Sequence, residues 1–81
     1  MCHFAQMNKI RDEAVLKKFG QRVKQLRKEH GMSQDDLAAE CDIEKTQIYR
    51  IEGGKINTTI STLKLLAEAF KMTIEELMKG I

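Results

Sequence analysis

Residues 33–55, with the sequence SQDDLAAECDIEKTQIYRIEGGK, constrain the fold more than any other part of this chain. Apolar residues recur there at helical spacing on both sides of a break of about three residues. The pattern predicts two short helices joined by a tight turn, the second covering about 45–52. Asp42 stands where this turn needs a left-handed residue, which aspartate tolerates less well than glycine. Because the rest of the chain holds no candidate for catalysis, function is to be sought in this pair of helices.

The whole chain is predicted to be all-α, with one domain and a small core. It has 81 residues, no proline and a strong apolar period of about 3.6 residues. Residues 1–11 are expected to form a flexible N-terminal arm, and 12–81 a single domain. Within 12–81 we expect five helices, at about 12–29, from Ser33 to about Cys41, at about 45–52, from Thr58 or Thr59 to about Phe70, and from Thr73 onward.

The apolar stripe of each helix predicts the core. The expected inward residues are Val15 or Leu16, Phe19, Val23, Leu26, Leu37, Ala38, Cys41, Ile48, Ile51, Ile60, Leu63, Leu66, Ala67, Phe70, Ile74, Leu77 and Met78. Gly20 interrupts the first stripe, and it either lets another helix approach closely or marks a later helix start near 17–19. Helix ends are expected at Gly31 and Gly53-Gly54, and N-terminal caps at Ser33 and Thr73, where Glu76 would complete a capping box.

Composition excludes several classes of protein. No apolar run approaches the roughly 20 residues of a membrane span, and no signal peptide is recognisable, so we expect a cytoplasmic protein without a membrane partner. Cys2 and Cys41 lack the spacing of metal ligands, so we expect no metal, no cofactor and no disulfide. His3 and His30 have no recognisable catalytic partner, which argues against an enzyme.

Charge is unevenly distributed along the chain. Residues 9–28 have a balance of +6, residues 29–44 a balance of −6, and residues 45–58 a balance of +2. This asymmetry fits a protein with one basic face, although a charge run is also common on an ordinary solvated helix.

The second helix of the pair carries side chains suited to reading DNA bases. Ile48 and Ile51 would anchor it, while the opposite side presents Lys45, Thr46, Tyr49 and Arg50, with Gln47 near the boundary. Arginine and lysine suit guanine, glutamine suits adenine, and a threonine methyl suits the thymine methyl. The alternative for each is an ordinary surface residue.

Other residues suit the phosphate backbone. Gln34 stands in the first turn of its helix, where a side-chain amide and backbone N–H groups bind phosphate well. Gly53, Gly54, Lys55 and Asn57 follow the second helix, where glycines bring backbone N–H groups close to a phosphate and the lysine adds charge. A solvent-facing Gln34 is the alternative to the first role. A plain helix end is the competing explanation for the glycines, and both can hold together.

The segment from Phe19 to about Leu77 resembles the XRE or phage-repressor-like helix-turn-helix domain. The matching motifs are FGQRVKQLR (19–27), GMSQDDLA (31–38), IYRIEGGK (48–55) and TLKLLAEAF (62–70). The resemblance implies a five-helix domain that binds operator DNA as a dimer and regulates transcription.

The resemblance also implies roles for single residues. It places Gln34 on a phosphate, Lys45, Thr46 and Arg50 toward the bases, and residues 53–55 toward the backbone. It pairs Arg27 with Glu52 in a partly buried ion pair. The chain departs from the family at Asp42, where glycine is common, at Glu44, where serine or threonine is favoured, and at 57–59, where proline is common. These departures put individual base contacts in doubt.

We therefore expect a homodimeric, sequence-specific regulator of transcription that binds double-stranded DNA at a near-palindromic operator. A repressor or autoregulator similar to restriction–modification controllers fits best, with no small-molecule ligand. The expected dimer interface is Ile74, Leu77, Met78 and Ile81, whose alternative is intrachain core. The alternative function is an antitoxin that binds a toxin protein as well as its own operator.

Overall fold

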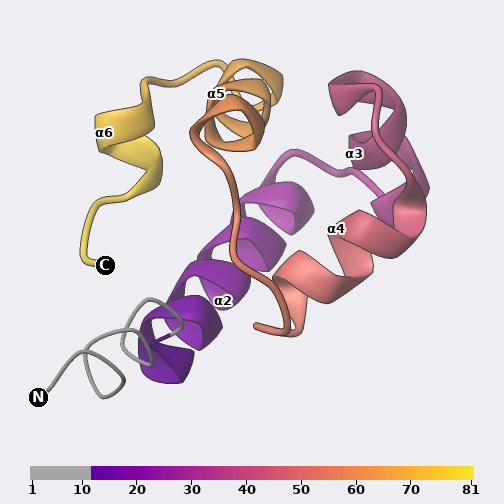
Figure 1. Ribbon diagram of the computed structural model, residues 1–81. Helices are drawn as coiled ribbons and strands as arrows, with labels where there is room; N and C mark the ends of the chain where they lie inside the picture. Colours follow the sequence, from indigo (N-terminus) through magenta and orange to yellow (C-terminus); the bar gives the residue numbers. More distant parts are fainter. Residues whose placement is uncertain (1–11) are drawn as a thin grey trace, which may run out of the picture.

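The computed structural model describes residues 12–81, and every regular element in that range is an α-helix (Figure 1). The helices are α2 (Glu13–Glu29), α3 (Gln34–Cys41), α4 (Lys45–Glu52), α5 (Ile60–Ala69) and α6 (Ile74–Leu77). The prediction of an all-α fold with five helices in this range is confirmed. The predicted arm, residues 1–11, lies outside the described residues.

Helices α3 and α4 lie beside each other on one side of the molecule, and α6 lies on the other side of α5 (Figure 1). Helix α2 packs against α4, α3 packs against both α4 and α5, and α5 packs against α6. Each helix contributes apolar side chains to one core: Leu16, Phe19, Val23, Leu26, Leu37, Ala38, Cys41, Ile48, Ile51, Leu66, Ala67, Phe70 and Leu77. The pair α3–α4 is therefore held between α2 and α5.

At two places on the apolar stripes, the structure decides which residues are buried. Leu16 is buried and Val15 is 40% exposed, so the first stripe passes through Leu16. The prediction that Ile60 is buried is wrong, because Ile60 is 78% exposed. The inward face of α5 is centred on Thr62, Leu66 and Phe70, and Ile60, at the first position of the helix, lies at the edge of that face.

The helix starts follow their sequence signals. Ser33 Oγ accepts from the backbone N–H of Asp36, and the Asp36 carboxylate accepts in return from the backbone N–H of Ser33. Thr73 and Glu76 form the same reciprocal pair at α6. These hydrogen bonds favour the ionised carboxylates, so they hold the pKa of Asp36 and the pKa of Glu76 below their ordinary values. At α5 the cap is Thr59 rather than Thr58.

The turn between α3 and α4 has the predicted left-handed residue. Asp42 has φ 55° and ψ 44°, and the next backbone N–H, that of Ile43, donates to the carbonyl of Ala38. Lys71 takes the same conformation after α5, with φ 57°, and nothing local in the sequence distinguishes it. Both residues end a helix in the way that glycine commonly does.

Gly20 lies in the interior of α2, so the later helix start is excluded and the close approach is confirmed. A Cβ at this position would lie 2.4 Å from the Ile51 carbonyl oxygen and 2.6 Å from that of Glu52. The end of α4 therefore rests directly on the backbone of α2.

Cys41 is 1% exposed and packs in the core as a small apolar side chain. Burial, with a smaller contribution from the nearby Glu40 carboxylate, raises the pKa of the Cys41 thiol to about 11. Among residues 12–81, no cluster of metal-ligating side chains is present, and no helix is long and apolar enough to cross a membrane.

Candidate nucleic-acid interface

Helix α4 has one buried face and one exposed polar face. Ile48 and Ile51 are 0% and 1% exposed, and they fix the helix against the core. The side chains of Lys45, Thr46, Tyr49 and Arg50 are exposed, and Gln47 is half-buried at the boundary. The structure thus brings the five residues expected to read bases onto the outward side of one rigid helix.

The start of α4 carries charge of both signs. Glu44 precedes the helix and makes no capping hydrogen bond through its side chain, consistent with its departure from the family's serine or threonine. Lys45 Nζ lies 3.6 Å from Asp35 Oδ1 on α3, and both side chains are more than half exposed. An exposed pair of this kind contributes at most about 1 kcal/mol, so Lys45 can exchange this partner for a base or a phosphate.

Arg27 and Glu52, which the family resemblance paired, form a two-point ion pair that joins α2 to the end of α4. Arg27 Nε lies 2.6 Å from Glu52 Oε2, and Arg27 Nη2 donates to Glu52 Oε1 at 3.1 Å. The two side chains are 10% and 4% exposed. Arg27 Nη1 also donates to the carbonyl of Met32, which fixes the segment that leads into α3.

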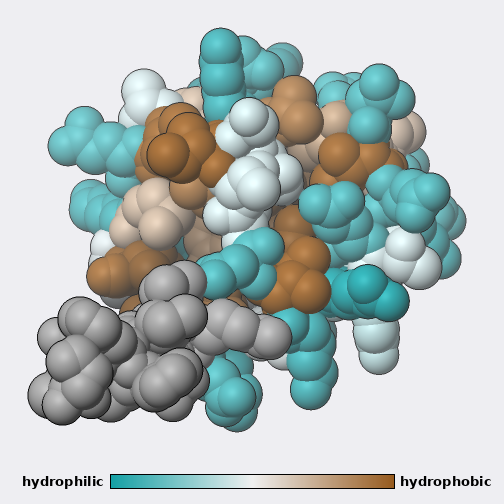
Figure 2. Space-filling view, in the orientation of Figure 1, coloured by the Kyte–Doolittle hydropathy of each residue, from teal (hydrophilic) through white to brown (hydrophobic). Residues whose placement is uncertain are grey.

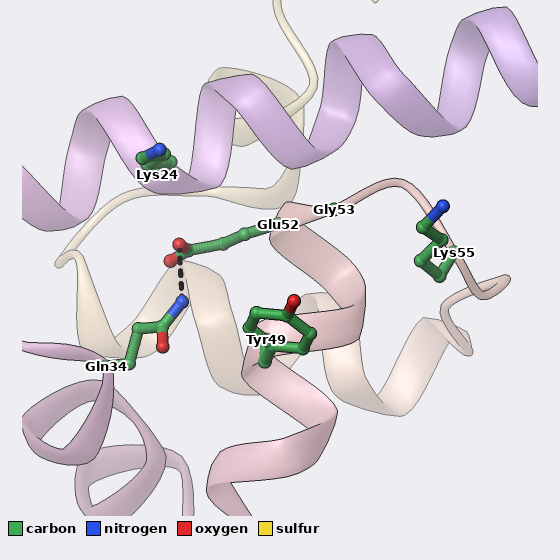
Figure 3. Close-up of a pocket in the computed structure, with 6 residues that line it drawn as sticks. All are labelled: Lys24, Gln34, Tyr49, Glu52, Gly53 and Lys55. Atoms are coloured by element: carbon green, nitrogen blue, oxygen red, sulfur yellow. Dashed lines mark hydrogen bonds between the residues drawn. The ribbon is translucent and has the colours of Figure 1, made fainter.

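The Gln34 side chain is hydrogen-bonded to the Arg27–Glu52 pair, so it is not a purely solvent-facing residue. Its Nε2 donates to Glu52 Oε1 at 3.1 Å, the contact drawn as a dashed line in Figure 3. The amide side chain at the start of α3 is thus fixed relative to the last turn of α4. This link was not anticipated from the sequence, because the two residues are 18 positions apart.

A polar cavity of about 170 Å³ opens beside this network. Figure 3 shows the side chains that line it, which come from α2, from the first turn of α3, and from the end of α4 and the segment after it. The lining residues are Lys24, Gln34, Tyr49, Glu52, Gly53 and Lys55. Lys24 is the lining residue that the sequence did not single out. Only the positive charge balance of residues 9–28 pointed to the helix that carries it.

The glycine segment after α4 forms a helix end. The N–H groups of Gly53, Gly54 and Lys55 donate to the carbonyls of Tyr49, Ile51 and Arg50 at 2.9–3.0 Å. Gly54 has φ +69°, so the segment closes α4 as an ordinary glycine helix end. The phosphate contact expected of the two glycines stays a prediction. The side chains of Lys55 and Asn57 are exposed, so their expected backbone contacts stay predictions.

One residue of the predicted dimer interface is corrected. Leu77 is fully buried in the core, so it has no surface to offer a second copy, and the alternative of intrachain core holds. Ile74, Met78 and Ile81 are only partly buried. Figure 2 shows hydrophobic side chains over the region of α6 and near the C-terminus, among hydrophilic ones.

Arg22 fixes the short helix α6, and this role was not visible in the sequence. Its Nη2 donates to the carbonyl of Glu76 at 2.8 Å, and its Nε donates to that of Leu77 at 3.2 Å. The guanidinium thereby satisfies carbonyls at the end of α6, where a positive charge is favourable.

Two short helices joined by a tight turn, the second anchored by isoleucines and polar outside, define a helix-turn-helix DNA-binding unit. The family model described as helix-turn-helix matches residues 23–77. The chain belongs to this helix-turn-helix family, whose members include transcriptional regulators.

The relatives agree with that assignment. The chain is 35% identical over 65 residues to the control protein C.MunI of Mycoplasma sp, covering 79% of this chain and 88% of the relative. It is 36% identical over 61 residues to the control protein C.BamHI of Bacillus amyloliquefaciens, covering 74% and 75% of the two chains. Both names describe control proteins, and neither is an enzyme name.

A solved structure shows the same fold. The restriction-modification controller protein C.AhdI from Aeromonas hydrophila matches with a TM-score of 0.77 and 34% identity. The match covers 79% of this chain and 97% of that chain. The protein is thus a helix-turn-helix transcriptional regulator related to such controllers.

Proposed function

We propose that this protein is an autoregulatory controller that binds a near-palindromic operator as a homodimer, acting in the cytoplasm. The observation that carries the proposal is the rigid presentation of the polar face of α4. Ile48 and Ile51 bury one side of the helix, and the Arg27–Glu52 pair locks its end to α2. A helix held in this way keeps its outer side chains in register with base edges.

Four residues of α4 are assigned to base reading. Thr46 and Arg50 lie near the middle of the outward face, and Lys45 and Gln47 lie on its two edges. A bidentate contact from Arg50 to guanine would supply about 1–3 kcal/mol of discrimination. Gln34, Lys55 and Asn57 are assigned to the phosphate backbone, and the Gln34–Glu52 hydrogen bond supports this by fixing the Gln34 amide.

We place the dimer contact on the partly buried apolar residues near the C-terminus: Ile74, Met78 and Ile81. Two-fold symmetry would set the two α4 helices about 34 Å apart, one turn of DNA. No effector ligand is proposed, so occupancy would follow protein concentration. The antitoxin alternative gains no support, since none of the relatives described above is named as one.

Selection of bound duplexes from a random DNA pool tests the proposal. We expect enriched sequences with two inverted half-sites about one helical turn apart, bound by two copies of the chain as measured by sedimentation. Recovery of no consensus, or of a single half-site bound by one copy, would contradict it.

Salt dependence provides an independent check. Contacts between cationic side chains and phosphates release counterions, so the affinity for the selected operator should fall steeply as salt rises. An affinity that does not change with salt would be incompatible with the proposed docking.

A further inference from the structure

The cavity beside α4 collects groups that suit a single anion. Lys24 and Lys55 bring two ammonium groups, Tyr49 brings a phenolic hydroxyl, and Gln34 brings an amide. Helix α3 begins at Gln34, so the positive end of its dipole lies at the same wall. These groups come from four separate parts of the chain, and the fold alone brings them together (Figure 3).

The Glu52 carboxylate also lines the cavity, but it repels an anion less than an unpaired carboxylate would. Glu52 receives two hydrogen bonds from Arg27 and one from Gln34, and its side chain is 4% exposed. Its charge is therefore balanced within the protein. The other polar side chains that line the cavity can donate hydrogen bonds, and the exposed lysines give it positive charge.

Tyr49 lies on the side of α4 that faces this cavity. It precedes Glu52 by three residues, so the two side chains share one edge of the helix. Thr46 lies at the middle of the outward face, and Arg50 lies on the other side of it from Tyr49. The Tyr49 side chain is large and 66% exposed, and in Figure 3 it stands beside Gln34 and Glu52.

We propose that this cavity holds one phosphate group of the DNA backbone, bound by the Lys24 ammonium and the Tyr49 hydroxyl together with Gln34 and Lys55. The inference rests on the proposed function and deepens it. It adds helix α2 to the DNA-binding surface through Lys24. It also moves Tyr49 from the residues expected to read bases to those that position the protein on the backbone.

The test compares Lys24→Gln and Tyr49→Phe with the unmodified protein on the selected operator. Lys24→Gln should weaken binding to the operator and to its single-base variants by the same factor. It should also lower the steepness of log affinity against log salt by about 1.8, because each of the two copies loses one phosphate contact worth about 0.9. Tyr49→Phe should weaken all sequences equally, by several-fold, with an unchanged slope.

Lys18→Gln is the matched control. Lys18 is also an exposed lysine of α2, but it lies with Gln21, Arg22 and Gln25 on another side of the helix. This variant should keep the salt slope of the unmodified protein. All the substituted side chains are exposed, so thermal unfolding should show that every variant is folded.

Neutral methylphosphonate groups, placed at one backbone position at a time, locate the contact. At one phosphate in each half-site, neutralisation should weaken binding by the unmodified protein and leave Lys24→Gln unaffected. Three results would contradict the phosphate site and leave the proposed function intact: no position shows this pattern, Lys24→Gln behaves like Lys18→Gln, or Tyr49→Phe changes base preference. If the unmodified protein selects no DNA, the proposed function falls, and the inference falls with it.

Discussion

The backbone of Gly20 meets the backbone of Ile51 so closely that a Cβ on Gly20 would lie 2.4 Å from the Ile51 carbonyl oxygen. A glycine inside a helix costs about 1 kcal/mol relative to alanine. The structure accepts this cost at Gly20 because α2 and the end of α4 pack there without an intervening side chain. The approach sets the position of the helix that carries the proposed base readers.

Gly20→Ala should therefore destabilise the protein, although alanine is the better helix former. We expect the free energy of unfolding to fall by about 1–3 kcal/mol, as overpacking of a core does, measured by urea denaturation. Gln21→Ala, at the exposed neighbouring position, should change stability by no more than about 0.5 kcal/mol. A Gly20→Ala variant more stable than the parent would show that helix propensity outweighs the contact.

The Arg27–Glu52 pair should show strong coupling. Glu52→Leu leaves the Arg27 guanidinium nearly buried without its carboxylate, a change that typically costs about 3–5 kcal/mol. Arg27→Met with Glu52→Leu removes both charges, and this double variant should recover most of the loss. Chemical denaturation of the two single variants and the double variant gives the coupling energy. Additive losses would mean that the two side chains act independently.

Sequence patterns that involve residues only a few positions apart predicted the helices well. The range 45–52 of α4, the caps at Ser33 and Thr73, and the left-handed Asp42 all follow from neighbours within about four positions. The two caps depend on backbone groups that a nearby side chain reaches by itself.

Contacts between distant segments could not be found in this way. Arg22 donates to carbonyls more than 50 residues away, and Gln34 reaches Glu52 across 18. Ile60 was misplaced because it fits the apolar period of α5 but lies at the edge of the inward face, where it is 78% exposed. Lys24 joins the cavity only through the packing of α2 against α4.

Stability should fall at alkaline pH through Cys41. Its pKa is raised from 9.0 to about 11 in the folded protein, so the fold holds this proton more tightly than the unfolded chain does. The contribution is complete below pH 9 and is lost as pH rises from about 9 to about 11, by roughly 1.4 kcal/mol for each pH unit.

The measurement uses a Cys2→Ser background, so that Cys41 is the single thiol. Urea denaturation from pH 8 to about pH 10.5 should show a steeper loss of stability with Cys41 present than in Cys41→Ala. The difference between the two proteins isolates the thiol, because every other side chain is the same in both. Parallel pH profiles would mean that the buried thiol does not contribute.

Arg50 and Gln34 should separate base reading from backbone binding. Arg50→Ala is expected to lose about 1–3 kcal/mol for each half-site of the selected operator and to relax preference at one base pair of each half-site. Gln34→Ala should weaken every sequence by a similar factor. The measurement is equilibrium binding to the operator and to a set of single-base variants.

Arg50→Lys is the matched control for charge. Lysine keeps the positive charge but lacks the planar fork of arginine, so the salt slope should persist while discrimination falls. Gln34→Ala also removes a hydrogen bond to Glu52, so its binding is compared at a temperature where denaturation shows it fully folded. A base-specific effect at Gln34 with a uniform effect at Arg50 would reverse the two assignments. The face of α4 around Arg50 would then not be the surface that reads the operator.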